Sequence, residues 1–357
     1  MGEKKNIFIV GAGLAGSLIA ARSILAGHRV EMRDQFVHNS ATRVAAGLFN
    51  VMTGKVAKKT QFAEELLDSL KGFFEIEAFA ELKPLLHLMP IYRPFESGQS
   101  YNDWMAKITE PDYAALARHQ ASPILPDLIE NPMGGLEVKT CGWVDTVGLC
   151  TNLIPILSKI GDFKFEQGAF DYADLDPETG SIKGEQEAFD EVIFCEGIGI
   201  KQNPLFDFVD LRPLKGQVLD LKFEDGMPSD IIINKQAFLI PKDKNNYTSG
   251  STYELRYEDD QPTPEGIKSI SDSVSRAVSI PFSVTSAKAS LRPTSPNRWP
   301  ILGRHPKHKR IIVFNGLGTK GVLQGPYYSE MLRKWLDGEL EALPRGIDLA
   351  RFLKKIA

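Results

Sequence analysis

Six residues near the N-terminus have the types and spacing needed to hold a diphosphate. They read Gly11-Ala12-Gly13-Leu14-Ala15-Gly16 and fit the pattern G-x-G-x-x-G. In this pattern the first glycine permits a tight turn, the second admits a diphosphate to the backbone, and the third lets helix and strand pack closely. Asp34 follows at the end of the next expected strand, where an acid can accept hydrogen bonds from ribose hydroxyls. Glu31 is a competitor, but it falls in the middle of that strand.

The residues around this motif predict the elements that would position it. Ile7–Val10 is an apolar run, typical of a strand that is buried on both faces of a parallel sheet. Leucines and alanines at helical spacing follow the glycines, and Gly27 is expected just beyond the end of that helix. Arg29–Asp34 reads as the next strand. The helix start would offer unpaired N–H groups and a positive dipole end to the diphosphate.

Two later segments are expected in the same sheet. Val192–Cys195 and Ile311–Phe314 are apolar, and each precedes a glycine-containing turn. Ligand sites of such sheets lie at the carboxyl ends of the strands, so the loops after these segments should join the glycine turn.

The regions between these strands have a different character. Residues 62–135 alternate amphipathic helices, such as Phe62–Phe79, with proline-rich turns. Residues 215–285 contain strand-like stretches, such as Gln217–Phe223 and Ile231–Ile240. A second domain built from these inserts is the simplest arrangement.

The composition of the chain excludes several classes of protein. With 357 residues, 43% of them hydrophobic, the chain is long enough for a sizeable core. A net charge of −4 gives no basic bias of the kind that nucleic-acid surfaces show, so a nucleic-acid partner is not expected. The three cysteines, Cys141, Cys150 and Cys195, are too scattered for a disulfide framework and fit a reducing compartment. We expect a cytoplasmic protein without a signal peptide or membrane span, and no motif predicts a metal site.

Three further segments, taken with the glycine motif, resemble the D-amino-acid oxidase superfamily, in particular its glycine oxidase and sarcosine oxidase branch. The segment Ser40–Leu48 looks like the Ser/Ala-rich loop ending in Ala-Gly that this family places along its flavin. Leu291-Arg292-Pro293 and the following residues to Gly303 are similar to the family's Leu-Arg-Pro…Pro-x-x-Gly signature. Asn315–Val322 sits where the family has a glycine-rich turn before its last helix.

Two weaker matches, Gly142–Asp145 and Leu214–Val218, extend the resemblance over the whole chain. The resemblance implies an α/β fold, with a Rossmann-like FAD-binding domain and a discontinuous α+β substrate domain of antiparallel sheet plus helices. The FAD-binding domain would comprise residues 1–60, 138–215 and 286–357, and the substrate domain residues 61–137 and 216–285. FAD would be bound non-covalently, because none of the cysteines lies near the Leu-Arg-Pro region where sarcosine oxidases tether it. The expected cofactor-binding residues are Gly11, Ala12, Gly13, Leu14, Ala15, Gly16, Arg33, Asp34, Thr42, Arg43, Ala46, Gly47, Leu48, Gly197, Gly316, Gly318, Thr319, Lys320, Gly321 and Val322.

The resemblance also assigns residues to the substrate. Arg292 matches the residue that pairs with the substrate carboxylate in the glycine oxidase branch, and a guanidinium can do this bidentately. Phe238 stands where glycine oxidases use an active-site tyrosine, which suggests a more apolar substrate group or another pose. Lys320 would lie at the pyrimidine end of the flavin; Thr319-Lys320 resembles the Ser-Arg of a tRNA-modifying branch more than the Arg-Asn of glycine oxidases. The alternative for each cation is a structural or solvated role.

The sequence therefore predicts an FAD-dependent enzyme that oxidises the C–N bond of a small amino acid or secondary amine. Hydride would pass to flavin N5, giving an imine that water hydrolyses, and oxygen or an electron carrier would reoxidise the flavin. Two alternatives stay open: a tRNA-modifying oxidoreductase that removes a carboxymethyl group, and a flavin-binding protein without turnover. The lysines Lys55, Lys58 and Lys59 would serve a polyanionic substrate in the first alternative or form a solvated face. The sequence leaves the oligomeric state and the identity of the amine open.

Overall fold

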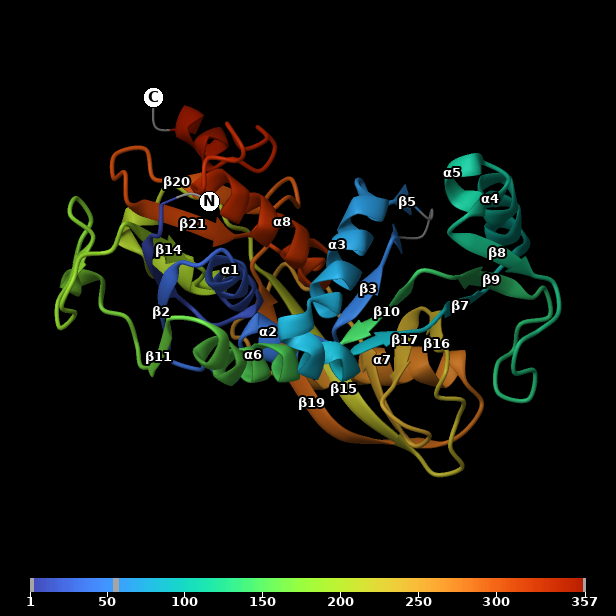
Figure 1. The fold of residues 1–357 in the computed structure, drawn as a ribbon. Coiled ribbons are helices and arrows are strands. Elements are labelled where there is room, and N and C mark those ends of the chain that lie inside the picture. Colours follow the sequence, from blue (N-terminus) through green and yellow to red (C-terminus); the bar gives the residue numbers. More distant parts are fainter. Residues whose placement is uncertain (1–2, 54–57, 356–357) are drawn as a thin grey trace.

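The computed structural model describes residues 3–53 and 58–355 and contains two large sheets (Figure 1). The first has six strands, all parallel except the last, which is antiparallel to its neighbour. In spatial order the strands are β11 (Phe163–Gln167), β2 (Arg29–Asp34), β1 (Asn6–Val10), β14 (Glu191–Phe194), β21 (Ile311–Asn315) and β20 (Ile301–Arg304). Segments from the start, middle and end of the chain thus share one sheet, as the sequence predicts.

Both faces of the first sheet are covered. Ile7 and Ile9 pack in the core that contains the helices α1 (Leu14–Leu25), α6 (Thr146–Ile160) and α8 (Gly321–Leu336). Phe8 and Val10 point to the opposite face and join a second core. This two-sided burial explains why the strand reads as a continuous apolar run. Gly27 has φ +90° and follows Ala26, the C-cap residue of α1, as expected just beyond a helix end.

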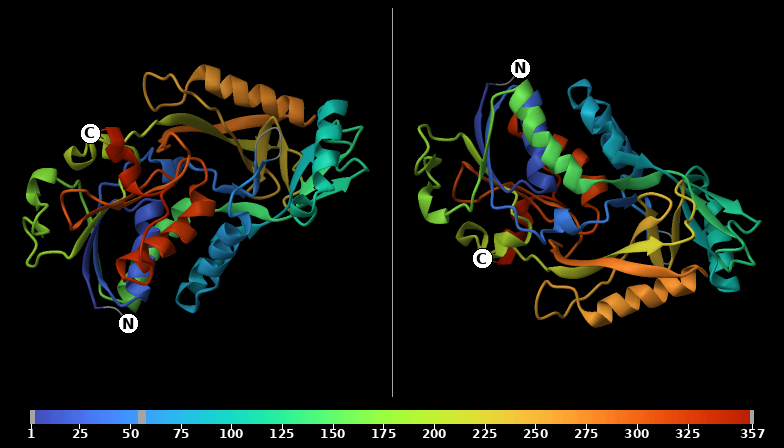
Figure 2. Two further views of the ribbon diagram at one scale, coloured as in Figure 1. Left: turned by 90° about the horizontal axis from the view of Figure 1, so that it is seen from above. Right: turned by 90° about the horizontal axis from the view of Figure 1, so that it is seen from below.

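The second sheet has eight strands and is mostly antiparallel. Its spatial order is β19 (Phe282–Arg292), β15 (Leu214–Phe223), β18 (Asn246–Gly250), β17 (Ala237–Pro241), β16 (Ile232–Lys235), β7 (Ile91–Pro94), β9 (Gly135–Val138) and β8 (Ala117–Gln120). One face packs on α7 (Pro264–Ala277), through a core that includes Leu219, Leu239, Ile270 and Val274. Both views in Figure 2 place α7 at the outer edge of the molecule, on the side of this sheet away from α1 and α8.

A small sheet joins the two large ones. Its order is β3 (Leu48–Asn50), β10 (Cys141–Val144) and β6 (Leu86–Leu88), and it brings the end of the Ser40–Leu48 loop beside β10. The remaining α-helices are α2 (Ala41–Val44), α3 (Ala63–Glu75), α4 (Gly98–Ile108) and α5 (Pro111–Ala114). The remaining strands are β4 (Met52–Thr53), β5 (Lys58–Lys59), β12 (Leu175–Asp176) and β13 (Ser181–Ile182). Within the described residues no helix combines the length and apolar character needed to cross a bilayer.

Two expected elements differ from the structure. The helix expected at Phe62–Phe79 ends at Glu75, and the chain turns at Ile76 so that Phe79 folds back onto Phe73, with ring centroids 5.1 Å apart. The stretch Ile231–Ile240 is a hairpin rather than one strand, because Gln236, at φ +61°, forms the turn between β16 and β17. The turn at Ile76 interrupts an apolar pattern that continues through it, whereas the turn at Gln236 lies in a polar triplet, residues 234–236, between two apolar runs.

Candidate cofactor and substrate site

The glycine motif lies between β1 and α1, where its backbone is tightly packed. A side chain on Gly16 would place its Cβ 1.8 Å from the carbonyl oxygen of Gly11. Gly13 precedes the first residue of α1 and has no side chain to cap the helix, and of the first N–H groups that of Leu14 donates to the hydroxyl of Thr42. The start of α1 therefore fits an anionic group that the helix N-terminus would bind, which is the fit that a dinucleotide diphosphate requires.

Asp34 supports this turn from the end of β2. One of its carboxylate oxygens accepts a hydrogen bond from the backbone N–H of Ala12 at 2.6 Å, and the other accepts from that of Phe36. A carboxylate has about four acceptor positions, so capacity is left for ribose hydroxyls. Glu31 is buried and bonded to Arg29 and Lys164, which agrees with a structural role in the middle of the strand.

Arg33 has a different environment from its neighbour Asp34. Its guanidinium contacts Glu166 and Glu185, at 3.0 Å each, and lies over the ring of Phe8. Phe8 belongs to the second core, on the face of the first sheet away from α1. A contact of Arg33 with the cofactor would have to come from its backbone, whose carbonyl already accepts from the N–H of Gly11.

The loop that resembles the family's flavin loop is fixed against α1 and α6 through Thr42. The Thr42 hydroxyl oxygen accepts from the backbone N–H of Leu14 at 3.0 Å, and its carbonyl accepts from the hydroxyl of Thr146 at 2.7 Å. The loop ends where the backbone of Val144 donates to the carbonyl of Gly47. Leu48 then pairs with Trp143 in the small sheet. Arg43 lies over the ring of Phe36, and Ala46 packs against the main core.

Asn315 joins the two loops that follow β14 and β21. It is buried, its side-chain N–H donates to the carbonyl of Gly197 at 2.9 Å, and its side-chain oxygen accepts from the backbone N–H of Gly316 at 2.7 Å. The turn Gly316–Gly321 also contacts the Arg292 motif, because the N–H of Gly318 donates to the carbonyl of Pro293. The structure therefore brings both glycine-containing loops and the Leu-Arg-Pro motif together, at the carboxyl ends of parallel strands.

Lys320 directly precedes α8 in this turn. Its Nζ donates to the hydroxyl of Thr60 at 3.0 Å. Burial lowers the pKa of Lys320, and the positive charges of Arg298 and Lys58 lower this pKa further. Among the neighbouring expected residues, Thr319 is exposed and Val322 is buried. Lys55 lies outside the described residues, and Lys59 pairs with Glu64 at 2.6 Å.

Arg292 is the last residue of β19, and its guanidinium lies directly against Gly216 of β15. It donates to the carbonyl of Thr252 at 3.2 Å and lies 4.9 Å from the ring centroid of Tyr253. Burial lowers the pKa of Arg292, and the nearby acidic groups Tyr253 and Glu254 oppose this effect. No carboxylate of the described residues lies within ion-pair distance of Arg292, so its charge is available to a ligand.

The register of the second sheet places Phe238 on the same face as Arg292. Phe238 pairs with Gly250, which in turn pairs with Val218. Directly paired residues, and residues two apart in a strand, point to one face, so Gly216 shares that face. This face of the sheet is turned toward the Ser40–Leu48 loop, because the hydroxyl of Ser290, two residues before Arg292, donates to the carbonyl of Asn39 at 2.6 Å.

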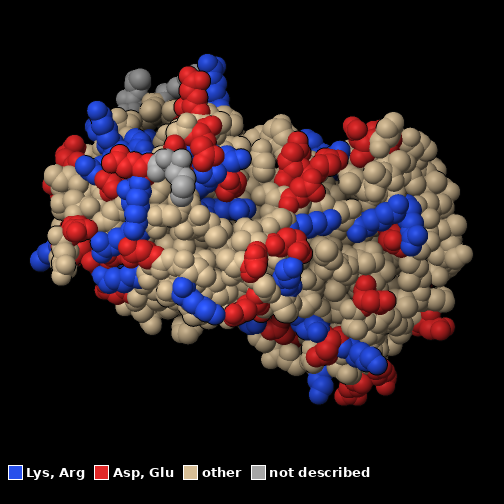
Figure 3. Space-filling model, viewed as in Figure 1, with Lys and Arg blue, Asp and Glu red and all other residues tan. Residues whose placement is uncertain are grey.

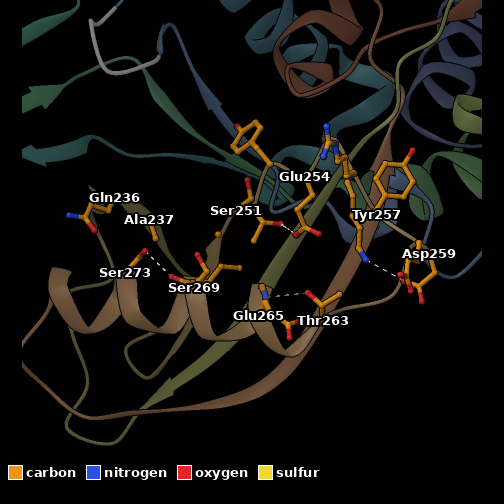
Figure 4. A pocket seen from close by; sticks show the side chains of 18 residues that line it. Gln236, Ala237, Ser251, Glu254, Tyr257, Asp259, Thr263, Glu265, Ser269 and Ser273 are labelled. Carbon is orange, nitrogen blue, oxygen red and sulfur yellow. Dashed lines mark hydrogen bonds and ion pairs between the residues drawn. The ribbon is translucent and has the colours of Figure 1, made fainter.

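A hollow of about 800 Å³ lies on the other face of β15, between α7 and the segment 251–259 (Figure 4). Lys215 lines it, is almost fully buried, and pairs with the exposed Asp259 at 3.3 Å. The predicted cofactor residues do not line this hollow. Within the part of the chain that the structure describes, no cluster of three or more His, Cys, Asp or Glu side chains could hold a metal ion.

Comparison with known proteins now decides the family. The model of the family described as FAD dependent oxidoreductase (DAO) matches residues 6–335. The chain belongs to this family. The protein is therefore an FAD-dependent oxidoreductase, and both the α/β fold and the family resemblance predicted from the sequence are confirmed.

Several DAO family members resemble the protein over nearly its full length. It is 24% identical to the tRNA 5-methylaminomethyl-2-thiouridine biosynthesis bifunctional protein MnmC of Marinobacter nauticus, covering 91% of this chain and 54% of that protein. The chain thus spans about half the length of that relative. It is 22% identical to glycine oxidase of Bacillus licheniformis, covering 95% and 94% of the two chains. The structure of iminodiacetate oxidase from Chelativorans sp. BNC1 has a TM-score of 0.79 at 18% identity, covering 96% of this chain and 98% of that one.

Several residues of the site were not given a role by the sequence. Asn315 stands inside a quoted motif, and its position between a buried strand and Gly316 was the available signal. Thr60 and Thr252 are single threonines in irregular segments, so no pattern marks them. Their partners, Lys320 and Arg292, come from remote parts of the chain.

Proposed function

We propose that this DAO family protein oxidises the C–N bond of a small amino acid or secondary amine with non-covalently bound FAD. The observation that carries the proposal is the guanidinium of Arg292. It is half-buried, has no carboxylate within ion-pair distance among the described residues, and lies on the sheet face turned toward the Ser40–Leu48 loop. A half-buried guanidinium that makes no direct ion pair favours an anionic ligand, and a carboxylate can accept two parallel hydrogen bonds from it.

The named substrates of two relatives support this class. Glycine and iminodiacetate, the compounds in the names of glycine oxidase and iminodiacetate oxidase, both place a carboxylate one carbon away from an amine nitrogen. Arg292 would hold such a carboxylate and thereby fix the carbon that loses hydride.

The other residues of the site would orient the reactants. Phe238 would pack against the apolar part of the substrate, since it shares a sheet face with Arg292. Gly11–Gly16 and Asp34 would hold the diphosphate and ribose of FAD, and Lys320 with the start of α8 would place positive charge at its pyrimidine end. When bound, FAD supplies the ring that accepts the hydride. No side-chain base is needed if the amine binds in its neutral form.

The test is an anaerobic titration of the FAD-reconstituted protein with a panel of small amino acids and secondary amines. We expect bleaching of the flavin absorbance by at least one carboxylate-bearing amine and not by the matching amine without a carboxylate. Arg292→Gln should raise the amine concentration for half-maximal bleaching about a hundredfold, because the charge-assisted pair is lost. Arg276→Gln, on the outer helix α7, is the matched control and should leave this concentration unchanged.

Two results would contradict the proposal. If the purified protein takes up no FAD on reconstitution, the proposed cofactor is wrong. Flavin that stays oxidised with every amine would favour a flavin-binding protein without turnover. Reoxidation of the bleached protein by air, or only by an added electron carrier, would decide between an oxidase and a dehydrogenase.

The tRNA-modifying alternative has one observation in its favour beyond the resemblance to MnmC. Lys58 and Arg298 both lie close enough to Lys320 for their positive charges to lower its pKa. Against it stands a net charge of −4, and Figure 3 shows lysines and arginines interspersed with acids over the face in view. Binding of unmodified and carboxymethylaminomethyl-modified tRNA, measured at rising salt, separates the cases. A steep loss of affinity with salt would support the tRNA substrate, since phosphate contacts release counterions.

A further inference from the structure

The guanidinium of Arg292 occupies the space that a side chain on Gly216 would need. A Cβ on Gly216 would lie 1.9, 2.0 and 2.3 Å from Nη2, Cζ and Nη1 of Arg292. Real Cβ atoms do not approach other atoms so closely, so any residue other than glycine at this position displaces the guanidinium. The contact spans two neighbouring strands, because Gly216 pairs with Ser290 in the register of β15 and β19.

Two residues of one segment hold the guanidinium in place. Tyr253 packs its ring against it, with 4.9 Å between Cζ of Arg292 and the ring centroid. The carbonyl of Thr252 accepts a hydrogen bond from Nη1 at 3.2 Å. This single bond uses one of the five N–H donors of a guanidinium, so most of its donor capacity remains for a ligand. We call Gly216, Thr252 and Tyr253 the arginine clamp.

Gln217 anchors the clamp from the opposite face of the sheet. Its side chain is fully buried, and its amide nitrogen donates to Glu254 at 2.7 Å and to the Thr263 hydroxyl at 2.9 Å. Its amide oxygen accepts from the backbone N–H of Thr263 at 2.8 Å, and its own backbone N–H donates to the hydroxyl of Thr252 at 3.0 Å. Glu254 and Thr263 both line the hollow beside α7 (Figure 4). One buried amide thus ties both ends of the segment 252–263 to β15.

We infer that Gly216 and Tyr253 are positioning residues for the substrate carboxylate, and that Gln217 fixes the segment through which Tyr253 acts. The inference rests on the proposed function, in which Arg292 receives the carboxylate. A guanidinium held between a strand backbone and an aromatic ring keeps one orientation, and bidentate recognition depends on orientation. The clamp therefore sets the affinity for the carboxylate, while the chemistry at the C–N bond is left to other groups.

The test measures acetate binding to the FAD-reconstituted protein by ligand-detected NMR, together with the kinetics of whichever amine bleaches the flavin. Tyr253→Ala should weaken acetate binding about fivefold to tenfold, because a cation–π contact is lost. Tyr253→Phe keeps the ring and should stay within about twofold of the wild type. Gly216→Ala should weaken binding about a hundredfold through the displaced guanidinium. For the amine, Tyr253→Ala should raise KM and leave kcat nearly unchanged.

Tyr257→Ala is the matched control, because Tyr257 lines the hollow in the same segment and has no contact with Arg292 among those that the structure gives. Equal acetate binding by Tyr253→Ala and Tyr257→Ala would overturn the inference. Tyr253 is 65% exposed, so its replacement should not impair folding even where Gly216→Ala does. If Arg292→Gln binds acetate as tightly as the wild type, the proposed role of Arg292 fails instead, so the two failures are distinguishable.

Discussion

The cofactor side and the substrate side of this site are built in different ways. At the glycine turn of the cofactor side, the contacts come from the backbone and from residues close in sequence, such as the bond between Ala12 and Asp34, which are 22 positions apart. On the substrate side, Arg292 meets Thr252, 40 positions away, and Gly216 on another strand. The first region is a local turn between one strand and one helix. The second exists only after the eight-stranded sheet has formed.

This difference has a consequence for substitutions. A site formed by local backbone tolerates a different side-chain chemistry, but it is disrupted when an added atom takes up the space beside the backbone. A site assembled from distant side chains fails when any supporting contact moves the key group.

The largest effect is expected at Gly16. Gly16→Ala places a Cβ 1.8 Å from the carbonyl oxygen of Gly11, so the strand and α1 must separate. We expect the affinity for FAD to fall by about a hundredfold or more, as overpacking costs of about 1–3 kcal/mol combine with a displaced phosphate cradle. Fluorescence titration of the apoprotein with FAD measures the change. Acetate binding does not report on this variant, because it is measured on the FAD-loaded protein.

Gly72→Ala in α3 is the control for this prediction. A Cβ on Gly72 meets no atom within 4 Å, and alanine is the better helix former by about 0.5–1 kcal/mol. It should leave FAD affinity unchanged and raise the melting temperature slightly. FAD affinity of Gly16→Ala equal to that of Gly72→Ala would show that the glycine turn does not hold the cofactor.

A smaller effect is expected at Asp34, whose side chain supports the glycine turn. Asp34→Ala removes the acceptors of the Ala12 and Phe36 N–H groups and any ribose contact. We expect FAD affinity to fall about tenfold and the free energy of unfolding to fall by about 1–2 kcal/mol. Titration with FAD and with FMN, which lacks the adenosine ribose, separates the two causes. Equal losses for both ligands would contradict a ribose contact.

More of the cofactor side than of the substrate side could be predicted from the sequence, because the signals of the cofactor side are local. Gly11–Gly16, Asp34 and the strand–helix–strand unit could be predicted from spacing alone, and the structure places them as one turn. The role of Arg292 came only from a family resemblance. Its clamp could not be predicted, because strand pairing decides which residue lies beneath a guanidinium, and spacing along the chain does not encode that pairing.

The same limit applies to the details of both regions. The break after Glu75 interrupts an apolar pattern that continues through it in the sequence, so spacing alone does not mark it. The hydrogen bond between Lys320 and Thr60 joins residues 260 positions apart, and no sequence motif marks this pair. The domain boundaries, the roles of the individual site residues and the non-covalent attachment of FAD stay predictions.

The smallest effect is expected at Lys320, which lies where the two regions meet. Its pKa is lowered in the folded protein, chiefly by burial, so the folded state binds this proton less tightly than the unfolded state does. The cost of the buried charge is fully present below the folded pKa, and it is relieved as pH rises through that value toward the ordinary lysine value of about 10.4. The stability of the wild type relative to Lys320→Met should therefore increase with pH in the alkaline range.

Urea unfolding of both proteins without FAD, from pH 7 to pH 10, measures this difference. A relative stability that does not change with pH would contradict a strained buried ammonium at this position. Repeating the series with FAD sharpens the comparison of the two regions. If Lys320 belongs to the cofactor side, the electronegative pyrimidine end of the flavin should raise its pKa and flatten the pH dependence. If it serves only to hold Thr60 and its segment, FAD should leave the slope unchanged, and Lys320 would then have a structural role.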